Sequence, residues 1–114
     1  MNQTKREDRH QPSATSLQAA LERWRSLDAV VVLREFADYA KKDESFKPVK
    51  ATTTSRWHAS VLGTEVELLL TGPKFWDSRA RVGGGGGGGA IDLVMYLAQT
   101  DFKTATRMLR ERQL

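Results

Sequence analysis

The sequence predicts an α+β fold in which a small antiparallel sheet is flanked by N-terminal and C-terminal helices. Three observations lead to this prediction. Apolar residues recur at helical spacing in residues 15–42 and again in residues 90–112. Between these segments, apolar and polar residues alternate on both sides of a Gly-first turn at Gly63-Thr64, as in a β-hairpin. A second turn at Gly72-Pro73 leads into a short aromatic segment, which completes a three-stranded sheet.

The chain divides into a tail and a folded part. Residues 1–14 are polar and charged, contain Pro12 and show no periodicity, which predicts a disordered tail. Residues 15–114 are expected to form a single domain. With 39% hydrophobic residues in a chain of 114, a modest core can form without a disulfide or a metal.

Two helices are expected before the sheet. Thr15 opens the first, and Thr15 with Gln18 can form a capping box. Asp28 is expected to cap a second helix that continues to Lys42. The β-branched run 30–32 favours a strand, but the length of the apolar pattern favours a helix. The apolar faces of these helices comprise Leu17, Ala20, Leu21, Trp24 and Leu27 in the first, and Val32, Leu33, Phe36 and Ala40 in the second.

The hairpin has a predicted register. Residues 41–55 form a polar loop in which Pro48 prevents a continuing helix. Folding the following segment about Gly63-Thr64 places apolar residues opposite each other on one face and mostly polar residues on the other. The predicted apolar cross-strand pairs are Trp57 with Leu70, Ala59 with Leu68, and Val61 with Val66.

The third strand is expected at residues 74–78. Because neighbouring side chains on a strand point to opposite faces, Phe75 is expected in the core and Trp76 near the surface beside Lys74. The alternative is that both rings are buried, since tryptophan is usually well buried.

Seven consecutive glycines, residues 83–89, precede the C-terminal helices. The first of these helices begins with Gly89 near its N-cap and Asp92 in its first turn. Asp101 is expected to cap the last helix. Inward-facing residues are predicted to be Ile91, Val94, Met95 and Ala98, then Phe102, Ala105 and Leu109, with Lys103, Arg107 and Arg110 on an outward stripe.

The glycine run has three interpretations. A nucleotide-binding loop is disfavoured, because Ala90 and Ile91 stand where a phosphate-binding loop has Lys and Ser or Thr. A flexible connector is the simplest reading. The third is a phosphate contact, in which backbone N–H groups and the following helix N-terminus touch a nucleic acid.

Charge and composition restrict the function classes. The net charge is +4 and the pI about 9.7, with the basic surplus in residues 74–114, which suits an acidic partner such as nucleic acid but also occurs on ordinary soluble surfaces. There is no cysteine and there are two distant histidines, so no metal site and no cofactor are expected. No apolar run is long enough to span a membrane and no signal peptide is evident, so a cytoplasmic protein without membrane contact is expected.

A specific family resemblance emerges in the C-terminal half. The glycine-to-helix junction, Gly86–Met95, and the segment DFKTATRML, residues 101–109, follow the hairpin in the order found in the zinc-binding N-terminal domain of bacterial DNA primases. The chain resembles most closely the metal-free variants of that domain in primase-like proteins of plasmids and other mobile elements. The resemblance covers roughly residues 56–112. It implies a zinc-ribbon-like sheet that must hold without zinc, because the cysteines of the zinc-bearing relatives are missing here.

The resemblance also implies a role in replication. It suggests a non-enzymatic module that binds single-stranded DNA and acts with a separately encoded primase, polymerase, helicase or relaxase. The catalytic portions of the primase family are absent, and no nucleophile–base pair can be derived from the sequence, so the chain is not expected to be an enzyme. The alternative is a protein-interaction adaptor or regulator that has lost nucleic-acid contact, with an exposed apolar patch at Trp24, Leu27, Val31 and Phe36.

The expected contacts combine cations, one aromatic ring and side-chain-free backbone. A basic groove with aromatic platforms is how proteins hold single strands. Lys103 and Arg107 would be flanking phosphate contacts if they lie beside the others, although such a stripe is more often simply solvated. The predicted nucleic-acid-binding residues are Lys74, Trp76, Arg79, Arg81, Gly86, Gly87, Gly88, Gly89, Lys103 and Arg107.

Overall fold

The computed structural model describes residues 14–49, 53–79 and 85–114. The described segments form four helices and one antiparallel sheet of strand order β1-β2-β3-β4-β5. The α+β class is confirmed, but the sheet has five strands rather than the three predicted. In chain order the elements are α2 (Ala14–Ser26), α3 (Ala29–Phe36), β1 (Tyr39–Lys42), β2 (Ser55–Val61), β3 (Thr64–Thr71), β4 (Lys74–Asp77), β5 (Gly86–Gly88), α4 (Ala90–Ala98) and α5 (Phe102–Glu111).

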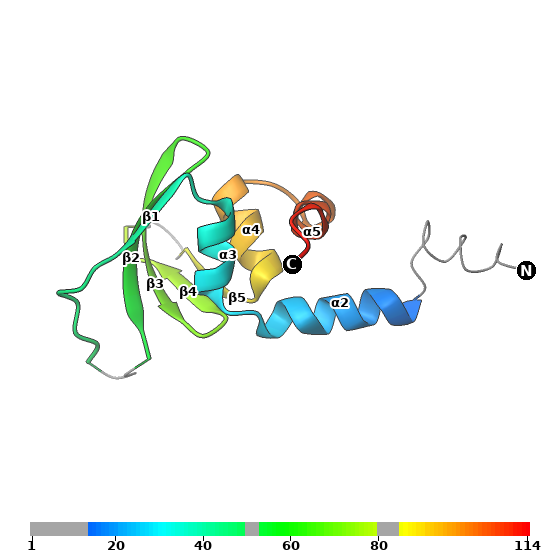
Figure 1. Ribbon diagram of the computed structural model, residues 1–114, viewed down its shortest axis with the longest axis horizontal. Helices are drawn as coiled ribbons and strands as arrows, with labels where there is room; N and C mark the ends of the chain where they lie inside the picture. The colour runs from blue at the N-terminus through cyan, green and yellow to red at the C-terminus, as the bar shows by residue number, and fades with distance from the viewer. Residues whose placement is uncertain (1–13, 50–52, 80–84) are drawn as a thin grey trace, which may run out of the picture.

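The helices cover one face of the sheet. Helices α3 and α4 lie against this inner face, α5 lies on the far side of α4, and α2 projects away from the sheet beneath α5 (Figure 1). The opposite, outer face carries no helix among the described residues (Figure 1). No described helix is long and apolar enough to cross a membrane.

The first additional strand, β1, replaces the end of the predicted second helix. That helix was expected to reach Lys42, but α3 ends at Phe36 because Ala37 is extended and Asp38 N–H donates to Ser60 O at 2.8 Å. Tyr39 and Ala40 then pair with β2. The sheet offers this segment a full ladder of hydrogen bonds, and helical periodicity alone could not reveal that alternative.

The β2–β3 register also differs from the prediction. The turn residues are Leu62 and Gly63, both at positive φ, so Val61 pairs with Thr64 and Trp57 with Leu68. Two positive φ angles give the turn whose twist matches that of the strands, which explains why it wins over a Gly63-Thr64 turn. The shift is two residues, so every side chain stays on its predicted face.

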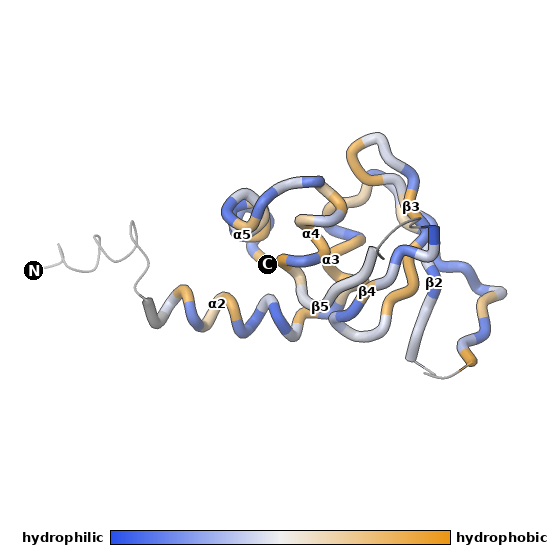
Figure 2. The backbone as a smooth tube through the Cα atoms, turned by 180° about the vertical axis from the view of Figure 1, so that it is seen from behind, coloured by the Kyte–Doolittle hydropathy of each residue, from blue (hydrophilic) through white to orange (hydrophobic). Residues whose placement is uncertain are grey.

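The core lies between the inner face of the sheet and helices α3 and α4. It is built from the alternate apolar residues of β2 and β3 and the apolar stripe of each helix, and full burial of each large side chain contributes about 1.5–3 kcal/mol. The largest fully buried side chains are Trp24, Leu33, Leu68, Leu70, Leu93 and Leu109. In Figure 2 the tube is mostly orange where α3 and α4 meet, and blue and orange alternate along α2.

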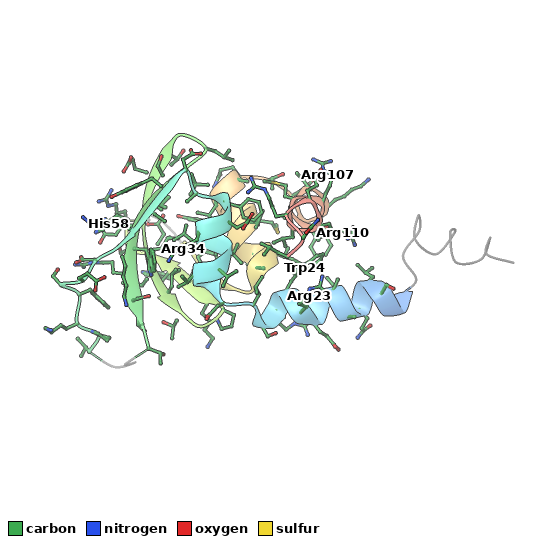
Figure 3. The ribbon with its side chains drawn as sticks, in the orientation of Figure 1. Arg23, Trp24, Arg34, His58, Arg107 and Arg110 are labelled. Carbon is green, nitrogen blue, oxygen red and sulfur yellow. The ribbon has the colours of Figure 1, made fainter. Side chains whose placement is uncertain are left out.

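Trp24 fastens α2 to the rest of the molecule. Its side chain is fully buried, so the predicted exposed patch does not include it, whereas Val31 is exposed. The guanidinium groups of Arg23 and Arg110 lie 5.6 and 5.7 Å from its ring centroids, and the three side chains converge where α2 meets α5 (Figure 3). Arg23 Nε also donates to Leu114 O at 2.9 Å, which ties the C-terminus to α2.

The structure confirms part of the predicted inward faces of α4 and α5 and corrects the rest. Helix α4 buries Leu93 and Leu97 beside the predicted Val94, and the remaining predicted apolar residues are only partly buried. In α5, Ala105 and Leu109 are buried as predicted, but Phe102 is 53% exposed because it stands in the first turn, at the end of the buried stripe. Asp101 caps α5 as predicted, since its carboxylate accepts from Thr104 N–H at 2.8 Å.

Candidate nucleic-acid interface

Strand β4 presents one aromatic ring to each face of the sheet, as the sequence predicts. Phe75 is buried on the inner face, and Trp76 is 48% exposed on the outer face. The other two tryptophans, Trp24 and Trp57, are buried. Trp76 is therefore the one tryptophan of the three whose ring can meet a ligand from solvent.

Residues 86–88 of the glycine run form strand β5, and two aromatic rings of β4 lie against it. A Cβ atom on Gly86 would stand 2.6 Å from Trp76 Cε3, and one on Gly87 would stand 3.1 Å from Phe75 Cε1. Gly86 pairs with Trp76 and Gly87 with Phe75 in the β4–β5 ladder. The rings replace the missing side chains, as aromatic residues often do opposite glycine in a sheet. Residues 86–88 are thus not a flexible connector.

Around Trp76 the outer face is hollowed. The hollow has a volume of about 580 Å³ and contains both polar and apolar groups. Lys74 lies at its edge and has no ion-pair partner among the described side chains. The hydroxyls of Thr54 and Thr71 are 2.7 Å apart. This first hollow is lined by Thr54, Leu69, Thr71, Lys74, Phe75, Trp76, Gly86 and Gly87.

Two arginines of the outer face, Arg56 and Arg79, are paired with acids. Arg79 Nε lies 3.1 Å from Glu67 Oε1, and Arg56 bridges Glu67 and Asp43 with Nε and Nη2 at 3.6 and 2.6 Å. Hydrogen bonds from Ser45 and Arg56 hold the pKa of Asp43 well below its usual range, so its charge persists. The free cation nearest Trp76 in the described part of this face is therefore Lys74, and Arg79 is already neutralised.

The predicted site residues fall into two groups. Lys74, Trp76, Gly86 and Gly87 come together around the first hollow, and Gly88 continues the same strand. Lys103 and Arg107 are exposed on α5, on the far side of α4 from the sheet, so they do not join that hollow (Figures 1 and 3). Arg107 instead pairs with Glu111 at 4.0 Å. Arg81 lies outside the described residues.

Gly89 has a separate role at the start of α4. It is the N-cap residue at φ +96°, and its N–H donates to Pro73 O at 2.9 Å. This conformation suits glycine, because a Cβ atom at such a φ is strained. Asp92 Oδ2 accepts from Gly88 N–H at 3.3 Å, so the acid predicted for the first turn also fastens β5.

A polar pair, formed by buried Asp77 and half-buried Tyr96, lies under the inner face of β4. Tyr96 on α4 donates to the Asp77 carboxylate, which also accepts from Arg79 N–H at 2.9 Å. Burial first, and the bond to Asp77 second, raise the pKa of Tyr96 to about 12. The pair fixes the end of β4 against α4. Sequence reasoning missed it because the partners are 19 residues apart and on different elements.

Sequence reasoning also missed the threonines and Leu69 of the first hollow. Thr71 and Leu69 alternate with buried residues on β3, so their outward direction could be inferred, but their place beside Trp76 depends on the β3–β4 register. Among the described residues, no three His, Asp or Glu side chains are grouped as metal ligands would be.

The chain matches no model of a known protein family, and no curated protein or solved structure matches it. What the outer face can bind is therefore inferred from its own residues.

Proposed function

We propose that this protein is a nucleic-acid-binding module that holds single-stranded DNA on the outer face of its sheet. The observation that carries the proposal is a half-exposed Trp76 seated over side-chain-free Gly86 in an open hollow, next to Lys74, for which the described residues provide no ion-pair partner. A flat ring offers a base a stacking surface, and the ammonium group offers a phosphate a charge.

The resemblance to metal-free primase zinc-binding domains supports the same function. It adds the expectation of a mobile-element or plasmid replication or transfer system. In that setting the module works with a separately encoded primase, polymerase, helicase or relaxase and performs no chemistry itself. The basic net charge of +4 favours association with an acidic polymer.

The first test is a titration of a fluorescently labelled oligothymidylate of about 20 nucleotides, followed by anisotropy at low and physiological salt. We expect an affinity that weakens with rising salt, since phosphate contacts release counterions. We also expect quenching of tryptophan fluorescence, because the accessible ring is Trp76. No binding at low salt would overturn the proposal and leave the protein-interaction adaptor as the alternative.

Variants of Trp76 test the site itself. Trp76→Ala should weaken binding by about 1–3 kcal/mol, or roughly 5- to 150-fold in Kd, through the loss of one stacked base. Trp76→Phe should keep most of the affinity but lose the quenching. Tyr39→Ala is the matched control, because Tyr39 is an exposed aromatic residue on β1, three strands away. Equal losses for Trp76→Ala and Tyr39→Ala would contradict the assignment.

A further inference from the structure

A second hollow lies where β5 ends, between α2 and the N-terminal ends of α4 and α5. It has a volume of about 300 Å³ and is lined by Leu21, Arg25, Gly88, Gly89, Ala90, Ile91, Asp92 and Phe102. Like the first hollow, it combines an exposed aromatic ring, Phe102, with a cation, Arg25, that has no ion-pair partner among the described side chains. An exposed aromatic ring and a cation therefore occur together in both hollows.

Gly88, which has no side chain, lies between the two hollows. It lines the second hollow and stands beside Lys74, which lines the first. A Cβ atom on Gly88 would meet Lys74 Cγ at 3.8 Å, and one on Gly89 would meet Arg25 Cα at 3.5 Å. The side chain of Lys74 therefore stands beside Gly88, whereas Gly89 packs against the backbone of α2 at Trp24 and Arg25. A nucleic-acid chain that passes from the first hollow to the second would therefore cross the backbone of Gly88. Lys74 stands at the start of this crossing, and Arg25 lines the second hollow at its end.

The hydrogen-bond pattern of β5 leaves the N–H of Gly86 facing the edge of the sheet beside the first hollow. Asp77 N–H donates to Gly85 O, and Gly89 N–H donates to Pro73 O. Hydrogen-bonded and non-hydrogen-bonded residue pairs alternate along an antiparallel ladder. The N–H and C=O groups of Gly86 and Gly88 therefore point away from β4. Asp92 takes the Gly88 N–H. The N–H of Gly86 points to the open edge of the sheet, where it can donate to a phosphate oxygen.

Asp92 and Arg25 both line the second hollow, but they do not form an ion pair with each other. Asp92 stands in the first turn of α4, where its charge is balanced by the helix dipole and by the Gly88 N–H that it accepts. Arg25 is on the facing helix α2 and is exposed. A phosphate can therefore approach the guanidinium from solvent.

We propose that a bound single strand of DNA does not end at Trp76 but crosses β5 over Gly88 into the second hollow. There Phe102 stacks a second base and Arg25 contacts a second phosphate. This inference rests on the proposed function and extends it, because it sets the path of the bound DNA strand and the length of the binding site. Single-strand sites on small folds span about 4–16 nucleotides, so both hollows fit within one site.

The test compares a short oligothymidylate of about 4 nucleotides with a long one of about 15 nucleotides. For the double variant Arg25→Ala with Phe102→Ala, we expect a loss of about tenfold or more in affinity for the long strand and little change for the short one. The slope of log affinity against log salt should also become shallower by about 0.7 for the long strand. Lys47→Ala, an exposed cation on the loop after β1, is the matched control.

A second variant tests the crossing point. Gly88 has ordinary space for a Cβ atom and does not have positive φ, so Gly88→Val should fold normally, which circular dichroism and thermal unfolding will check. The added branched side chain stands beside Lys74 on the path. We expect it to weaken the long strand about as much as the double variant does.

The outcomes separate the two proposals. If the double variant binds the long strand as well as the unmodified protein does, while Trp76→Ala weakens it, the crossing is wrong and the first hollow stands. If the double variant loses affinity equally for the short and the long oligothymidylate, the proposed crossing is also wrong. If the unmodified protein binds neither strand at low salt, both proposals fall.

Discussion

At the scale of single residues, the glycines of β5 are distinguished by what lies over them. The Trp76 ring occupies the Cβ position of Gly86, whereas the Cβ position of Gly88 is in ordinary contact with a lysine chain. A uniform run of seven identical letters therefore contains residues of unequal structural importance. The sequence could not rank them, because the distinction arises from the rings on β4.

We predict that Gly86→Ala destabilises the protein by about 1–3 kcal/mol, since the new methyl group must displace the Trp76 ring or the Phe75 carbonyl. Gly88→Ala should change the free energy of unfolding by less than about 0.5 kcal/mol. Urea unfolding of both variants, followed by circular dichroism, makes the comparison. Equal effects at the two positions would show that the rings do not pack on the strand as described.

The Asp77–Tyr96 pair makes stability depend on alkaline pH. The pKa of Tyr96 rises from its ordinary 10.0 to about 12 in the folded state, so folding favours the protonated hydroxyl. This contribution is fully present below pH 10 and is lost as the pH rises through about 12. It should not change near neutral pH.

Tyr96→Phe tests this coupling. At neutral pH we expect a loss of about 1–3 kcal/mol, because the Asp77 carboxylate loses a buried donor. Between pH 10 and about 12 the difference in unfolding free energy between the two proteins should narrow, since the variant has no hydroxyl to titrate. A difference that stays constant across that range would show that Tyr96 titrates alike in the folded and unfolded states.

At the scale of elements, the β2–β3 hairpin shows how turn chemistry sets register. Leu62 occupies the left-handed region at φ +51°, and Gly63 follows at φ +82°. A leucine there is strained, and it is also exposed, so it gains little from burial. The strand pairing outweighs this local cost, which explains why the sequence suggested the wrong two turn residues.

Leu62→Asn should therefore stabilise the protein by about 0.5–1 kcal/mol, because Asn-Gly is the preferred pair for two successive positive φ angles. Gly63→Ala at the next position should instead cost about 1 kcal/mol. Thermal unfolding of the two single variants will show the opposite signs. Destabilisation by Leu62→Asn would mean that the leucine side chain contributes more through packing than its exposure indicates.

The two edge strands of the sheet, β1 and β5, show why the number of strands could not be predicted from local sequence patterns. Strand β1 arises from the end of a helical pattern, and β5 from glycines that have no strand propensity. Each exists because a neighbouring strand offers hydrogen bonds to its backbone. Helix ends with clear local chemistry, such as the Asp101 cap, were predictable because the cap and its partner are three residues apart.

At the scale of the whole molecule, the layers separate Lys74 from Arg107, which the sequence analysis assigned to one site, and bring Arg25 close to the glycines instead (Figure 1). Arg107 is on α5, on the far side of α4 from the sheet (Figures 1 and 3), whereas Lys74 lines the first hollow and Arg25 lines the second beside Gly89. The proposed surface therefore runs around the edge of the sheet at β5 rather than along the basic stripe of α5. Phe102, expected in the core, becomes a candidate platform because of this arrangement.

The sequence by itself determined the features that depend on local periodicity and neighbouring residues. These include the α+β class, the faces of β2 and β3, the opposite directions of Phe75 and Trp76, and the caps at Gly89 and Asp101. The tertiary structure alone decided the number of strands, the hairpin register, the Asp77–Tyr96 pair and the packing of Gly89 against the backbone of α2. The physical reason is that backbone pairing and side-chain contacts between distant segments outweigh local preferences of about 1 kcal/mol per residue, and a sequence pattern records only the latter.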